Sequence, residues 1–90
     1  MSPEIASFHG IRIRMFVADH DPPRIHAGHV GDEAKVGFAA DAPYILAGAL
    51  SPAIERHVLR WVREHRLALL LRWAQCQRRQ TPARIGEEES

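Results

Sequence analysis

The chain has 90 residues, of which 46% are hydrophobic and 26% charged, and its formal net charge is +1. These values are typical of one small globular domain with a thin two-layer core. The sequence lacks an apolar run of roughly 20 residues, an N-terminal secretory signal and a second cysteine beside Cys76, so we expect a cytoplasmic protein without a membrane-spanning segment or an internal disulfide.

The first half of the chain predicts an antiparallel meander of three or four strands. Residues 11–18 begin with strict alternation of apolar and polar side chains, which is typical of a strand with one buried face. Residues 24–30 can return as a second strand, the pair Gly31-Asp32 can turn, and residues 33–39 alternate again. Residues 44–48 form either a short fourth strand or an extended connector. The short connections imply antiparallel pairing.

The second half predicts helices that cover one face of this sheet. Ser51 and Pro52 are typical of a helix start, because serine accepts from early N–H groups and proline at the first helical position loses no hydrogen bond. Residues 53–80 contain neither glycine nor proline, and the apolar phase shifts near His65. We therefore expect two helices that meet there or one long kinked helix.

The predicted fold class is α+β, with a single domain over residues 1–82 and a flexible acidic tail over residues 83–90. The expected core consists of the apolar positions on the inner faces of these elements: Ile11, Ile13, Met15, Ile25, Val36, Phe38, Ile54, Val58, Trp61, Val62, Leu67, Leu70 and Leu71. Cys76 has Arg72 and Arg79 nearby on the same helix, which can lower the pKa of its thiol, but no base or partner motif surrounds it, so no functional role is expected for Cys76.

Charge is distributed unevenly along the chain. Residues 51–86 carry eight arginines against two glutamates, whereas residues 1–50 carry a net negative charge. Arginine favours forked contacts to phosphate or carboxylate groups, so this half predicts a surface for RNA, DNA or an acidic protein partner. A solvated helix face is the alternative interpretation. The candidate binding residues are Arg56, Arg60, Arg63, Arg66 and Arg72.

Titratable residues gather between the first two predicted strands, in the segment Asp19-His20-Asp21-Pro22-Pro23-Arg24-Ile25-His26. Proline fixes its own φ and restricts the residue before it, so the turn is stiff. His20 and His26 flank the two prolines and can converge on one pocket. Arg24 would lie between them, and Asp19 or Asp21 would orient an imidazole. Such a set can cleave RNA by acid–base catalysis, so a ribonuclease is one candidate function.

Metal binding is a second candidate function for the same segment. His20, His26 and His29 offer nitrogen ligands for zinc or a similar divalent ion. A regular strand would however point His26 and His29 to opposite faces, and their spacing matches no standard metal motif. Histidines that form hydrogen bonds within the turn are the competing interpretation, so no cofactor is expected.

The sequence resembles a bacterial family, domain of unknown function (DUF) 4160. The resemblance covers residues 2–75 and rests on Pro3-Glu4-Ile5, Phe8-x-Gly10-Ile11-x-Ile13, Asp19-His20-x-Pro22-Pro23-x-x-His26-Ala27, Ala34, Gly48, Trp61-x-x-x-His65 and Trp73. Family members commonly carry a histidine directly after the second proline, where this chain has Arg24. A metal site built on that histidine would be lost here.

The resemblance implies a short cytosolic protein, often encoded beside another small protein in an arrangement like a toxin–antitoxin pair, and it implies no established activity. We therefore expect an interaction module that binds a protein partner or nucleic acid and does not contact a membrane. Open sheet edges, Trp61 and Trp73 are candidate contact surfaces, with packing in the core as the alternative for the two tryptophans and the preferred interpretation for Trp61. A homodimer is an alternative, because a second chain often completes the thin core of a small protein.

Overall fold

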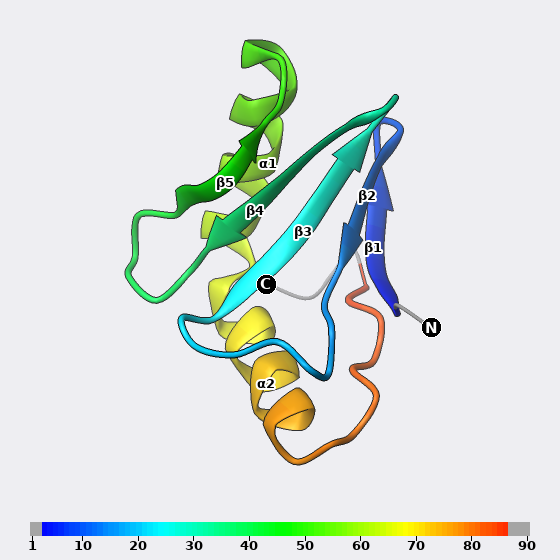
Figure 1. The fold of residues 1–90 in the computed structure, drawn as a ribbon, viewed down its shortest axis with the longest axis vertical. Helices are drawn as coiled ribbons and strands as arrows, with labels where there is room; N and C mark the ends of the chain where they lie inside the picture. The colour runs from blue at the N-terminus through cyan, green and yellow to red at the C-terminus, as the bar shows by residue number, and fades with distance from the viewer. Residues whose placement is uncertain (1–2, 87–90) are drawn as a thin grey trace.

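The computed structural model describes residues 3–86, which form a five-stranded antiparallel sheet and two helices. Each strand pairs with the next one in the chain, so the spatial order is also the chain order (Figure 1). The α+β class and the meander followed by two helices are confirmed, with five strands rather than three or four. The elements are β1 (Glu4–Phe8), β2 (Ile11–Arg14), β3 (Arg24–His29), β4 (Asp32–Gly37), β5 (Tyr44–Ala49), α1 (Pro52–Glu64) and α2 (Arg66–Gln77).

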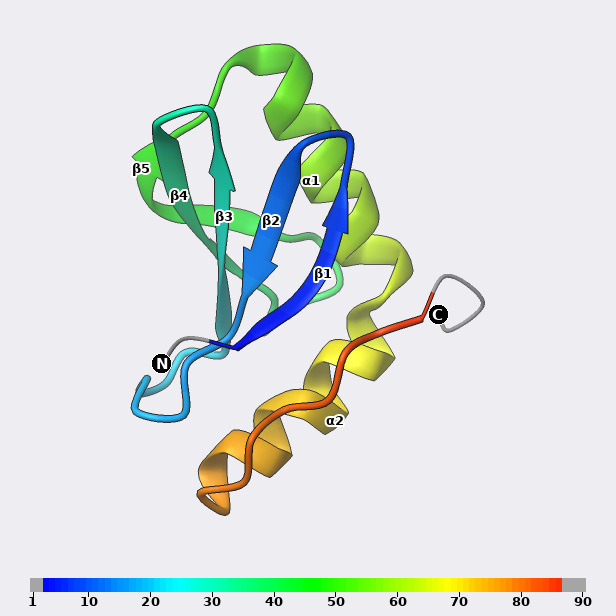
Figure 2. The same ribbon diagram turned by 90° about the vertical axis from the view of Figure 1, so that its right-hand side faces the viewer.

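The molecule has two layers, because both helices lie on the same side of the sheet (Figure 2). Alternate side chains of a strand point to opposite sides, so Ile11 and Ile13 of β2 are buried beneath the helices while Arg12 and Arg14 face away from them. We call this second side the open face. Among residues 3–86 no helix has the length and the hydropathy needed to cross a membrane.

Strand β1 is the element that the sequence analysis did not predict. A bulge between Glu4 and Ala6 shifts its register against β2, and the adjacent residues Ile5 and Ala6 are both buried. The period-2 pattern that identifies a strand is therefore broken. His9 and Gly10 connect β1 to β2 with φ values of 52° and 74°, which is typical of a tight type I′ hairpin turn.

The turn between β3 and β4 lies one residue earlier than the sequence predicted. Its central residues are Val30 and Gly31, with φ values of 43° and 84°, and Asp32 is already the first residue of β4. A β-branched residue rarely adopts positive φ, so the sequence favoured Gly31-Asp32.

The structure also decides between the interpretations that the sequence left open for residues 44–48 and for the helical region. The first segment is a strand, β5, and not an extended connector. The helical region consists of two distinct helices, which are separated by His65. The N–H of His65 still donates to the Trp61 carbonyl at 3.0 Å, so the first helix ends directly before the second begins.

The core lies between the sheet and the helices, and most of its predicted members are buried there. The prediction that Leu67 and Leu71 belong to the core is wrong, because these residues are 69% and 63% exposed. The run from 67 to 71 is almost entirely apolar, so periodicity does not identify its buried side. The face of α2 that packs inward consists of Ala68, Leu69, Trp73 and Cys76, while Ile54, Trp61 and Leu70 are partly buried against the core.

Residues 83–86 pack on the domain and do not belong to the predicted tail. Ile85 is buried, and its N–H donates to the Ile5 carbonyl at 2.8 Å. Arg84 forms an ion pair with Glu4 at 2.9 Å, and the Arg72 guanidinium donates to the carbonyls of Ala83 and Arg84. The acidic composition of the last residues led to the prediction of a tail that included residues 83–86. The rest of the predicted tail, 87–90, lies outside the described residues.

Candidate functional site

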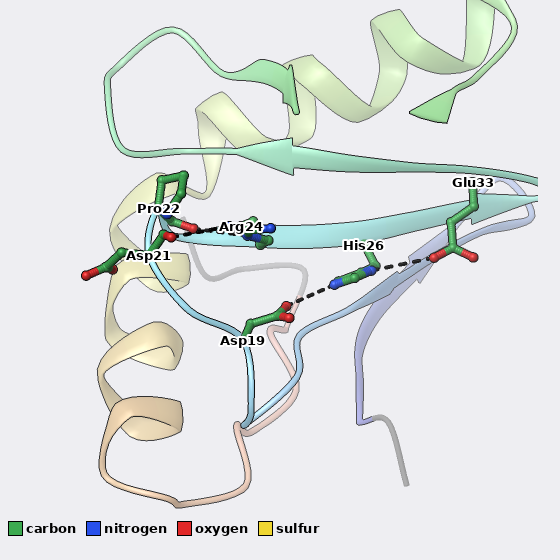
Figure 3. Close-up of polar contacts among 6 residues, drawn as sticks. All are labelled: Asp19, Asp21, Pro22, Arg24, His26 and Glu33. Atoms are coloured by element: carbon green, nitrogen blue, oxygen red, sulfur yellow. Dashed lines mark hydrogen bonds and ion pairs between the residues drawn. The ribbon is translucent and has the colours of Figure 1, made fainter. Parts of the chain in front are cut away.

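The segment from Asp19 to His26 spans the end of the loop between β2 and β3 and the start of β3, and His26 on β3 is its most enclosed titratable residue. The His26 side chain is 11% exposed, and its Nε2 lies 2.9 Å from Asp19 Oδ2 (Figure 3). Nδ1 lies 3.5 Å from Glu33 Oε1 on β4, and Phe16 packs edge-on with its ring centroid 4.3 Å away. Two carboxylates and one aromatic ring therefore fix the imidazole.

Arg24 is engaged by the loop rather than directed toward His26. Its Nε donates to the Pro22 carbonyl at 3.2 Å and its Nη2 donates to the Asp21 carbonyl at 3.3 Å (Figure 3). These bonds cross the cis peptide bond between Asp21 and Pro22. The guanidinium that was predicted to lie between the two catalytic histidines thus holds the turn in shape.

The structure does not gather the other predicted catalytic residues around His26. Asp21 is exposed, and its carboxylate points away from the imidazole in Figure 3. His20 is exposed too, and it lies outside the hollow that adjoins His26. Of the two aspartates that were candidates to orient an imidazole, Asp19 is the one that contacts His26.

The structure shows no preformed ligand set for the alternative of metal binding. Within the described residues, no three histidine, cysteine, aspartate or glutamate side chains stand close enough together to hold an ion. His20, His26 and His29 therefore do not form the cluster that their proximity in sequence allowed.

A hollow of about 290 Å³ opens on the open face beside His26. Most of its lining was not predicted from the sequence, because strand register decides which residues become neighbours. Arg12 stands opposite Gly28, and Gly28 opposite Glu33. The hollow is lined chiefly by Arg12, Arg14, His26, Gly28, His29 and Glu33.

The five arginines predicted to bind a partner divide into two groups. Arg66 donates to the carbonyls of Phe38 and Ala39 and pairs with Asp41, and Arg72 donates to the C-terminal segment. Both therefore join parts of the fold. Arg56, Arg60 and Arg63 are exposed on α1, where their spacing places them along one side of the helix.

This arginine row ends at the exposed leucines of α2. Arg63 and Leu67 line a common hollow of about 330 Å³ together with Asp41, Glu64 and Arg66. Leu71 follows Leu67 by one helical turn, so the two leucines are neighbours on the helix surface. We call the set Arg56, Arg60, Arg63, Leu67 and Leu71 the helix surface. The leucines were assigned to the core by sequence, so only the arginine part was found.

Cys76 is buried in the core, and desolvation raises the pKa of its thiol, with a further contribution from the negative charge of Asp19. The lowering of this pKa that Arg72 and Arg79 could have caused does not occur. A protonated, covered thiol is a packing residue, not a nucleophile.

The fold and these surfaces describe a small α+β protein whose helices carry a mixed basic and apolar face. The chain belongs to the family described as domain of unknown function (DUF4160), whose model matches residues 10–74. No curated protein and no solved structure matches the chain significantly. The family description assigns no activity, so a function must be inferred from the surfaces.

Proposed function

We propose that the protein is a binding module and that its helix surface takes a protein partner, one that offers apolar side chains next to carboxylates. The observation that carries the proposal is the pair Leu67 and Leu71, more than 60% exposed one turn apart beside Arg63. Adjacent exposed leucines on a helix that buries its other side are typical of a contact surface.

The leucines supply the apolar part of the contact. Removing their exposed area from water contributes about 2–4 kcal/mol together. The hollow between Arg63 and Leu67 can receive one side chain of the partner. An apolar anchor in a small hollow with charged residues at its edge is a common centre of a protein interface.

The arginines supply the charged part. Within residues 3–86, Arg56 and Arg63 have no side-chain hydrogen bond or ion pair, and Arg60 approaches Glu64 only at 3.9 Å. Guanidinium groups without an internal partner favour carboxylates, which they bind through two parallel hydrogen bonds. The chemistry of the partner is therefore an acidic surface with apolar residues at its centre.

Nucleic acid and a second copy of the chain fit this surface less well. Phosphate contacts use the arginines and leave the two leucines in water, so they gain nothing from the apolar half. A two-fold contact centred on this surface would bring the arginine rows of both copies into one interface, where like charges repel.

The function of a ribonuclease has less support, since its proposed groups are occupied or separated. Arg24 is bound by the Asp21 and Pro22 carbonyls, and His26 is held between Asp19 and Glu33. An enzyme of this kind would need His20 to approach His26 when RNA binds.

The test is co-elution with the product of the neighbouring gene, the partner that the family resemblance implies. The variants are Leu67→Ser with Leu71→Ser, Arg63→Glu, and Val30→Ser as a matched control, because Val30 is an exposed apolar residue on a distant turn. We expect the leucine pair and Arg63→Glu to lose the complex and Val30→Ser to keep it.

Three results would contradict the proposal. The leucine variant could retain full binding, the wild-type protein could elute alone as a dimer, or it could bind a single-stranded RNA with strong salt dependence that the leucine substitutions leave unchanged. The last result would assign the surface to nucleic acid.

A further inference from the structure

Beyond the helix surface, we propose that the hollow over Gly28 on the open face binds a compact zwitterion, with its anionic group on Arg14 and its ammonium group toward Glu33. The ligand class is a molecule of amino-acid size that carries a carboxylate or phosphate at one end and an amine at the other.

Strand register builds this hollow from two neighbouring rows of residues. In one row Arg12 of β2, Gly28 of β3 and Glu33 of β4 stand side by side. In the next row Arg14, His26 and Lys35 do the same. Because side chains on one face stand roughly perpendicular to the sheet, the absent side chain of Gly28 leaves a gap walled by its neighbours.

Gly28 has no conformational or packing reason to be glycine. Its φ lies outside the left-handed range, and a Cβ at this position would meet only the Asp32 carbonyl oxygen at 3.9 Å, an ordinary contact. By contrast, a Cβ on Gly37 would clash with the Tyr44 ring, and one on Gly48 would clash with the Glu33 carbonyl. Glycine inside a strand destabilises it and often marks close approach of a ligand.

The walls of the gap have opposite charges. Arg12 and Arg14 of β2 line one side, and the acidic residues Asp32 and Glu33 of β4 line the other. Arg12 already donates to Glu4, whereas Arg14 has no side-chain hydrogen bond or ion pair within residues 3–86. The Arg14 guanidinium is therefore available for a forked contact to a carboxylate or phosphate. Glu33 is 62% exposed, and its carboxylate can accept from an ammonium group.

Size and rigidity also favour a small ligand. The hollow measures about 290 Å³, which accommodates a ligand of amino-acid size. His26 closes one end, and its contacts to Asp19 and Glu33 keep this end fixed. A wall that is already held in place loses little entropy when a ligand binds.

The experiment is a set of titrations followed by the amide signals of residues 28–33 in NMR spectra. The probes are β-alanine and phosphoethanolamine as zwitterions, with acetate and inorganic phosphate as anions alone. We expect a zwitterion to shift these signals in a saturable manner at least about tenfold more tightly than the matching anion. The two zwitterions together distinguish a carboxylate from a phosphate ligand.

One variant fills the hollow, a second removes the charge that would bind the anionic group, and a third serves as a control. Gly28→Val should abolish binding while the protein stays as stable as wild type or becomes more stable, because a β-branched residue replaces glycine in a strand. Arg14→Gln should weaken binding roughly tenfold to hundredfold. Lys35→Gln should bind as wild type, since Lys35 stands beside His26 without lining the hollow.

The inference is overturned if neither zwitterion shifts the signals of residues 28–33, if acetate and phosphate bind as tightly as the zwitterions, or if folded Gly28→Val still binds. Partner binding through Leu67 and Leu71 does not use this hollow, so either proposal can fail while the other stands.

Discussion

Asp19 Oδ2 lies 2.9 Å from His26 Nε2, and this contact ties the loop between β2 and β3 to the middle of the open face. Both side chains are largely covered, at 22% and 11% exposure. One of the two histidines predicted to be catalytic therefore stabilises the preceding loop from its position on β3, and it also forms one end of the hollow over Gly28.

Asp19→Ala should lower the free energy of unfolding by about 1–3 kcal/mol, because it leaves a nearly buried imidazole without its acceptor. Asp21→Ala is the matched control: Asp21 is exposed two residues away, and its loss should change the free energy by less than about 0.5 kcal/mol. Urea denaturation of both variants measures the difference. Equal losses would show that the contact does not brace the loop.

The orientation of α2 gives a second prediction. Leu69→Ala should destabilise the protein by about 2–5 kcal/mol, since Leu69 is fully buried. Leu67→Ala should cost less than about 0.5 kcal/mol, because the Leu67 side chain faces water. The comparison of their unfolding midpoints tests which side of α2 packs on the sheet. A larger loss for Leu67→Ala would reverse the helix orientation described above.

The lowered pKa of Glu4 predicts that the folding stability of the protein depends on pH in the acidic range. Hydrogen bonds from Arg12 and then Arg84 lower the pKa of Glu4 from its ordinary value of 4.5. A carboxylate with a lowered pKa in the folded state stabilises the protein above the unfolded pKa, and this contribution is lost as the pH falls through the folded value. At pH 7 the wild-type protein should therefore be more stable than Glu4→Gln. This difference in stability should shrink as the pH falls below 4.5 and disappear below the lowered pKa of Glu4. Parallel stability curves down to pH 2 would contradict this.

Cys76 should react slowly with thiol reagents in the folded protein. Burial raises the pKa of its thiol above the ordinary value of 9.0, so the reactive thiolate is scarce at pH 8 and the sulfur is covered. Labelling with a disulfide reagent should be slower than in the unfolded chain by on the order of a hundredfold or more, because it requires local opening. Equal rates would indicate an accessible thiol.

Sequence reasoning predicted the fold class and most of the sheet because their signals are local. Alternating side chains identified β2 to β4, and Ser51-Pro52 identified the start of α1. The bulge in β1 broke the period, and the positive φ of Val30 hid the second hairpin turn. Such irregular backbone is set by pairing across the sheet, which one sequence does not display.

The candidate site was located but its internal arrangement was not. The Asp19 to His26 segment does contain a tightly held histidine, yet the partners of His26 come from a loop aspartate and from Glu33 one strand away. The hollow over Gly28 depends on register between three strands. The sequence did not show which side of α2 is buried, because leucines occur on several sides of this helix. The exposed pair Leu67 and Leu71 was therefore found only in the structure.

The proposed protein interface is tested by leucine methyl NMR spectra recorded with and without the purified product of the neighbouring gene. We expect the methyl signals of Leu67 and Leu71 to shift or broaden on binding, while those of buried Leu69 and of Leu46 on β5 stay in place. Unchanged Leu67 and Leu71 signals in a formed complex, or changes confined to Leu46, would contradict this expectation and move the interface elsewhere.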